Sequence, residues 1–239
     1  MTAGAAAQVI LLTGLTLVAG LGLAGWLAAL LFAGAGGAML IGGLRRSGAV
    51  DFGPADRVTL ARAVLVGGVT ALVVDSLQQP VPVPVLVGVA AVALSLDAVD
   101  GRVARRTGTC SPLGARFDME VDAFLILVLS AYLATSLGAW VLVIGGMRYA
   151  FVAASWNLTW LRAPLPPSLV RKTVAATQGI ALTVAASGLL PALGAIVLTA
   201  LALAALVWSF STDVLWLFRH RITVPARLPS TWTLQPAHR

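Results

Sequence analysis

Acidic residues are rare in this 239-residue chain, and five of the nine lie within a stretch of 26 positions. Four of them form two pairs, because Asp97 and Asp100 are three residues apart and Asp118 and Asp122 are four apart. On a helix, each spacing puts both side chains on one face, and Glu120 then points to another face. Oxygen ligands alone suit hard cations such as Mg²⁺ or Mn²⁺. Two such ions between paired carboxylates suit phosphoryl-type transfer, so the four aspartates are predicted to form a divalent-metal site.

Each aspartate pair sits at the end of an apolar stretch, 83–100 for the first pair and 117–135 for the second. A charged carboxylate at the centre of a membrane helix costs roughly 2.5–3.5 kcal/mol, so a group of four needs compensation. Metal cations and proton relays are the usual reasons for such a group. Two antiparallel helices would bring both pairs to one pocket. The small residues Gly101, Ala104 and Gly114 would let backbones and a flat ligand approach closely there.

The composition predicts an all-α integral membrane protein. The chain is 59% hydrophobic and only 10% charged, whereas a soluble domain has about 25% charged residues. A membrane helix needs ~20 residues, and the first apolar stretch is long enough for two short spans. Gly20, Gly22 and Gly25 lie in its middle and predict a helical hairpin, which makes eight spans; a single tilted span, which makes seven, is the alternative. The apolar stretches run through 8–43, 60–75, 83–100, 117–135, 139–160, 173–189 and 192–218.

The sixteen basic residues lie in alternate connections and in the tail, in the segments 45–62, 102–116, 148–172 and 219–239. By the positive-inside rule, the basic connections within these segments and the tail are predicted to be cytoplasmic. We therefore expect a multi-pass protein of the cytoplasmic membrane whose carboxylate pocket opens to the cytoplasm. Attraction to anionic lipid heads explains the net charge of +7 better than nucleic-acid binding, since no basic-aromatic ladder is present. One cysteine excludes an internal disulfide framework, and two histidines near the C-terminus argue against a histidine-ligated metal.

The carboxylates belong to a longer pattern of fixed residues. The chain reads Asp97-Ala-Val-Asp100-Gly101-Arg-Val-Ala104-Arg105 and, after eight residues, Gly114-Ala-Arg-Phe-Asp118-Met-Glu-Val-Asp122. This pattern resembles the signature D-x-x-D-G-x-x-A-R-x8-G-x3-D-x3-D of the CDP-alcohol phosphotransferase family at every fixed position and gap. The resemblance implies a six-helix core with an addition before it. It predicts an N-terminal hydrophobic hairpin (1–45), a CDP-alcohol phosphotransferase membrane domain (46–218) and a cytoplasmic tail (219–239).

The resemblance also implies roles for the signature residues. Asp97, Asp100 and Asp118 would hold two divalent cations, Mg²⁺ or Mn²⁺, on the pyrophosphate of a CDP-linked donor. Asp122 would complete the metal site and act as general base on the acceptor hydroxyl, so that CMP leaves. The nucleotide would lie against Gly101, Ala104, Arg105 and Gly114.

A second segment, earlier in the chain, also resembles the family. It reads Pro54-Ala-Asp56-Arg-Val-Thr59-Leu-Ala-Arg62 and is similar to the family pattern P-x-[ND]-x-x-T-x-x-R. The resemblance implies that Asp56 and Thr59 touch the cytidine. Alternatively, Asp56 simply caps the helix that begins at Arg57.

The acceptor is less well defined by the sequence. Arg171-Lys172 with Gln178 partly resembles the G-K-x-K-T-x-x-Q segment of glycerophosphate-using members, and with Arg148 these cations could hold an acceptor phosphate. The alternative is charge that only sets membrane topology. We expect CDP-diacylglycerol as donor, a small polar alcohol of the glycerol 3-phosphate or inositol phosphate type as acceptor, and a place in phospholipid biosynthesis. Alternatives are a CDP-linked head group with a lipid acceptor, or a divalent-cation transporter. A homodimer is usual for the family, and the small-residue-rich spans permit it.

Overall fold

The computed structural model describes residues 2–47, 54–107, 112–166 and 168–220, and in this part of the chain every regular element is a helix. The first helix ends just before Gly20, which has a φ of +67°. The backbone N–H of Gly20 donates a hydrogen bond of 3.0 Å to the carbonyl oxygen of Thr16. Glycine adopts this left-handed conformation without steric cost and so ends a helix. The first apolar stretch is therefore two helices, α1 (Thr2–Ala19) and α2 (Leu23–Ser47). That each of them crosses a bilayer stays a prediction.

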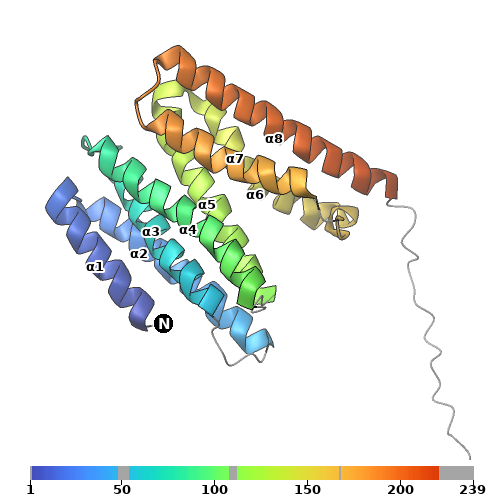
Figure 1. The fold of residues 1–239 in the computed structure, drawn as a ribbon, viewed down its shortest axis with the longest axis horizontal. Helices are drawn as coiled ribbons and strands as arrows, with labels where there is room; N and C mark the ends of the chain where they lie inside the picture. Colours follow the sequence, from blue (N-terminus) through green and yellow to red (C-terminus); the bar gives the residue numbers. More distant parts are fainter. Residues whose placement is uncertain (1, 48–53, 108–111, 167, 221–239) are drawn as a thin grey trace, which may run out of the picture.

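Six further α-helices follow the hairpin in the described part of the chain (Figure 1). They are α3 (Pro54–Asp75), α4 (Val83–Thr107), α5 (Pro112–Leu137), α6 (Leu142–Asn157), α7 (Leu169–Ala186) and α8 (Ala192–His220). Two short 3-10 helices flank α6 and are η1 (Ala139–Val141) and η2 (Thr159–Arg162). Gly138, with a φ of +104°, makes the tight connection from α5 into η1.

Helix α3 is the centre of the first half of the molecule. It packs against α1, α2, α4 and α5, and its Val66, Val69 and Leu72 are fully buried. Helix α5 joins this half to the second, because it also contacts α6 and α7, and α7 pairs with α8. In Figure 1 the blue hairpin and the orange-red pair α7–α8 accordingly lie on opposite sides of α5. This arrangement packs α4 and α5 against α3, and these three helices carry both sequence motifs.

Five helical segments among the described residues are long and apolar enough to cross a membrane. They are Leu23–Gly43, Val58–Asp75, Gly114–Leu137, Ala139–Asn157 and Ala192–His220. Helices α1 and α4 contribute shorter apolar segments, Ala3–Ala19 and Val83–Asp97. Long apolar helices of this kind indicate a multi-pass membrane protein, whereas the count of eight spans stays a prediction.

The far end of α3 is tied to the hairpin turn by a group that we call the Asp75 cluster, made of Asp75, Gly22 and Gln79. Asp75 is 1% exposed and accepts a hydrogen bond of 3.0 Å from the backbone N–H of Gly22. Gln79 donates to the Asp75 carboxylate and, at 2.9 Å, to the carbonyl of Gly20. A buried carboxylate is stable where several donors satisfy it, so this cluster fixes the hairpin to the core.

Candidate metal and nucleotide site

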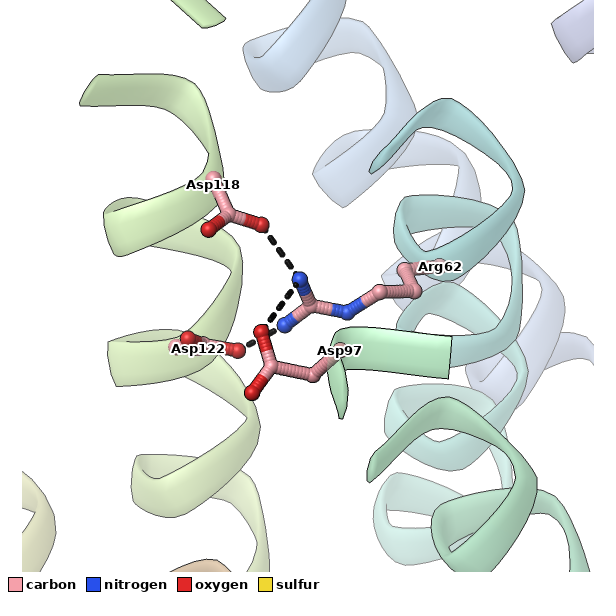
Figure 2. Close-up of polar contacts among 4 residues, drawn as sticks. All are labelled: Arg62, Asp97, Asp118 and Asp122. Atoms are coloured by element: carbon pink, nitrogen blue, oxygen red, sulfur yellow. Dashed lines mark hydrogen bonds and ion pairs between the residues drawn. The ribbon is translucent and has the colours of Figure 1, made fainter. Parts of the chain in front are cut away.

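Around the first half of α3, side chains from three helices meet. Arg62 projects from α3, Asp97 from α4, and Asp118 and Asp122 from α5 (Figure 2). Asp118 and Asp122 lie one above the other on α5, as their spacing of four predicts. We call these four residues the Arg62 cluster.

The three carboxylates are close enough to share an ion. One oxygen from each of Asp97, Asp118 and Asp122 lies within 4.8 Å of the others. Mg²⁺ binds oxygens at ~2.0–2.1 Å, so two of its ligand oxygens are at most about 4.2 Å apart. Small side-chain rotations would therefore bring the three oxygens around one ion. An all-oxygen donor set fits Mg²⁺ or Mn²⁺, in agreement with the cofactor that the sequence predicts.

Arg62 is the residue that the sequence reasoning missed. Its side chain is 1% exposed, and Nη1 lies 3.0 Å from Asp97 Oδ1. Nη1 also donates to Asp118 Oδ1 and Nη2 to Asp122 Oδ1. On sequence, Arg62 was grouped with the topology-setting charges of a basic connection. The available signal was its place as the arginine that ends the pattern P-x-[ND]-x-x-T-x-x-R, inside an apolar stretch, because a buried arginine needs acidic partners.

Among the side chains that the structure describes, the charges of the Arg62 cluster do not cancel. One guanidinium faces three carboxylates, and these are only about one-third exposed, with side-chain exposures of 39%, 33% and 37% for Asp97, Asp118 and Asp122. The remaining negative charge, partly shielded from water, attracts further cations more strongly than a surface site would. The cluster is therefore suited to divalent ions.

The residues predicted to touch the nucleotide flank this cluster where they are described. Thr59 is buried, one turn before Arg62 on α3, and Gly114 is half-buried, one turn before Asp118 on α5. The side chains of the other predicted site residues lie outside the described residues, and these are Asp56, Asp100, Gly101, Ala104 and Arg105.

The three predicted acceptor-binding cations do not converge in the same way. Arg148 on α6 pairs with Glu120 of α5, so Glu120 turns away from the other carboxylates. Arg171 forms an ion pair of 2.9 Å with Asp213 of α8 and donates to Pro166 O at 2.7 Å. Lys172 is exposed at the start of α7. Both arginines thus already have structural partners.

The comparisons with known proteins agree with this geometry. The family model described as CDP-alcohol phosphatidyltransferase matches residues 53–215, a segment that contains α3, α4 and α5 with the whole Arg62 cluster. Among the curated proteins and among the solved structures, no significant match to the chain is found. The family model covers well over half of the sequence, and the aspartate signature falls inside the matched segment. The chain belongs to the CDP-alcohol phosphatidyltransferase family, a family of transferases.

Proposed function

We propose that the protein transfers a phosphatidyl group from CDP-diacylglycerol to the hydroxyl of a small polar alcohol and releases CMP, as a step of phospholipid biosynthesis. The observation that carries this proposal is the convergence of Asp97, Asp118 and Asp122, from two helices of the family segment, on one partly exposed point. Asp100 completes the aspartate signature in sequence. Two divalent cations held there would neutralise the pyrophosphate of the donor and stabilise the leaving CMP.

The chain's own residues supply the rest of the chemistry. Asp122 Oδ1 is engaged by Arg62, so Oδ2 is the oxygen that takes the proton from the acceptor hydroxyl. The acceptor oxygen then forms a bond to the lipid-side phosphorus. The bond between that phosphorus and the bridging oxygen breaks, and CMP leaves with the electron pair. Thr59, one turn before Arg62 on α3, and Gly114, one turn before Asp118 on α5, would hold the cytidine end in line with the attack.

A phosphorylated acceptor, such as glycerol 3-phosphate or an inositol phosphate, fits the cations on the α6–α7 side. Arg148 lies at the level of the Arg62 cluster along α5, because its partner Glu120 stands between Asp118 and Asp122 in sequence, although on another face of the helix. An acceptor phosphate would replace Glu120 as the partner of Arg148. A guanidinium binds a phosphate in the same bidentate geometry in which it binds a carboxylate. Arg171 and Lys172 would add positive charge at the start of α7.

A CMP-release assay tests the proposal. Purified protein with Mg²⁺ or Mn²⁺, labelled CDP-diacylglycerol and a panel of polar acceptors should release CMP and yield a labelled lipid only with the right acceptor. Asp122→Asn should abolish release while nucleotide binding largely remains. Asp75→Asn, at the opposite end of α3, is the matched control and should retain release per folded molecule.

Three results would contradict the proposal. Full CMP release by both Asp97→Asn and Asp122→Asn would show that the reaction does not take place at this site. Label transfer only from a CDP-linked head group to a lipid acceptor would reverse the donor and acceptor. Cation flux into liposomes without nucleotide, and without CMP release, would favour a transporter.

A further inference from the structure

We infer that Arg62 is a positioning residue that holds one oxygen of each of three aspartates and thereby presents the second oxygen of each to divalent ions. The inference rests on the proposed function, because it needs a divalent site at Asp97, Asp118 and Asp122. It adds a role that the signature carboxylates do not carry themselves. Arg62 lies on α3, outside the two helices that supply the carboxylates.

The first observation is the division of oxygens. Arg62 contacts Oδ1 of each of the three aspartates. In Figure 2, the second oxygen of each carboxylate points away from the guanidinium. Within the described residues, the contacts of Arg62 with the three aspartates thus leave the second oxygen of each one to a ligand.

The second observation is that Arg62 lies behind the carboxylates. Its side chain is 1% exposed, whereas those of the three aspartates are between 33% and 39% exposed. An ion or a nucleotide approaches from the accessible side and meets the free oxygens before the guanidinium. Carboxylate ligands of metal sites are commonly oriented in this way by hydrogen bonds from outside the ligand set.

The third observation is chemical. The guanidinium is a rigid planar fork with several donors, so Nη1 can bond Asp97 and Asp118 while Nη2 bonds Asp122. Lysine offers a compact point charge and cannot hold three carboxylates in one fixed arrangement. Without a cation at this place the carboxylates repel one another strongly and rotate apart. The opposing effect is repulsion between Arg62 and a bound ion. Removal of Arg62 should therefore weaken ion binding if Arg62 positions the carboxylates, and should strengthen it if Arg62 competes with the ion.

The test is Mn²⁺ binding to purified protein without nucleotide, followed by electron paramagnetic resonance. Arg62→Met should raise the Mn²⁺ dissociation constant about 10–100-fold, as loss of an orienting partner does in other metal sites. Arg62→Lys should raise it less, since it restores the charge but not the fork. Arg162→Met is the matched control, because the hydrogen bonds of Arg162 to the described residues go to the backbone carbonyls of Ser155 and Trp156, and it should bind Mn²⁺ like the wild type.

A second readout separates positioning from a purely structural role. In the CMP-release assay, the Mg²⁺ concentration for half-maximal activity should rise in Arg62→Lys, while kcat at saturating Mg²⁺ stays within a few-fold of wild type. A structural role alone would lower the folded fraction and leave the Mg²⁺ requirement of the folded molecules unchanged. If Arg62→Met does not fold, Arg62→Lys decides the question with both readouts.

Unchanged Mn²⁺ affinity in the Arg62 variants would overturn the inference and leave the proposed function standing. Tighter binding would overturn it as well and would identify Arg62 as a competitor for the carboxylate oxygens. If the wild type itself bound no Mn²⁺, the proposed metal-dependent function and the inference would fall together.

Discussion

Helix α3 carries two buried charged side chains, Arg62 in its first half and Asp75 at its C-terminal end, and the two clusters around them are built in opposite ways. Arg62 and Asp75 are thirteen residues apart, which is roughly 20 Å along a helix. Both side chains are 1% exposed. At Asp75 the charge is enclosed by neutral donors from the hairpin turn and from Gln79. At Arg62 one cation faces three carboxylates that reach toward the solvent.

The difference separates a structural cluster from one suited to chemistry. A polar group whose hydrogen bonds are all made inside the protein holds helices together and offers nothing to a ligand. A cluster with surplus charge and unused oxygens costs stability, and such groups are tolerated in membrane helices where they serve a function. Substitutions at the Arg62 cluster should therefore change turnover, and substitutions at the Asp75 cluster should change stability.

The largest effect is expected from Asp118→Asn in the Arg62 cluster. The substitution removes a metal ligand, so CMP release at saturating substrate should fall about 10²–10³-fold, as for loss of one electrostatic contact to a transition state. Thermal stability should change little, because Arg62 keeps Asp97 and Asp122 as partners. Measuring both quantities on one preparation checks the separation. A variant that unfolds at low temperature but turns over normally would show that this cluster is structural after all.

An intermediate effect, on stability instead of turnover, is expected from Asp75→Ala. The N–H of Gly22 and the amide of Gln79 lose their acceptor in a buried place, which costs about 1–3 kcal/mol of unfolding free energy. Tryptophan fluorescence during thermal or denaturant unfolding in detergent would measure the loss. CMP release per folded molecule should stay at the wild-type value. A turnover defect in fully folded Asp75→Ala would mean that the two ends of α3 are coupled.

The smallest effect on stability is expected from Gly22→Ala, which adds a methyl group to the hairpin side of the Asp75 cluster. An added Cβ would lie 2.8 Å from Asp75 Oδ1, and such overpacking should cost about 1 kcal/mol. Gly14→Ala in α1 is the matched control, because nothing lies within 4 Å of its added Cβ. It should be neutral or slightly stabilising, since alanine favours a helix over glycine. Equal unfolding midpoints for the two variants would show that the contact at Asp75 is loose.

Features that depend on local spacing could be predicted from the sequence. The helix break among the glycines near residue 20 and the shared face of Asp118 and Asp122 both follow from short-range geometry. The family signature further indicated that Asp97 would meet them. Arg62 was not assigned, because its partners lie 35 to 60 positions away on other helices. The same holds for Arg171, whose partner Asp213 is 42 residues further along, so neither ion pair leaves a local pattern.

One contact links the hairpin to α5, the helix that carries Asp118 and Asp122. Phe32 of α2 stacks on Phe124 of α5 with ring centroids 4.6 Å apart, and Phe124 lies two residues after Asp122. Tight packing transmits a change of ring size at position 32 to the backbone of α5. A random-mutagenesis screen that selects only for catalysis would therefore be expected to recover changes in α2, before the first residue of the family match. Directed evolution of this protein should therefore include the hairpin residues among the positions that are mutated.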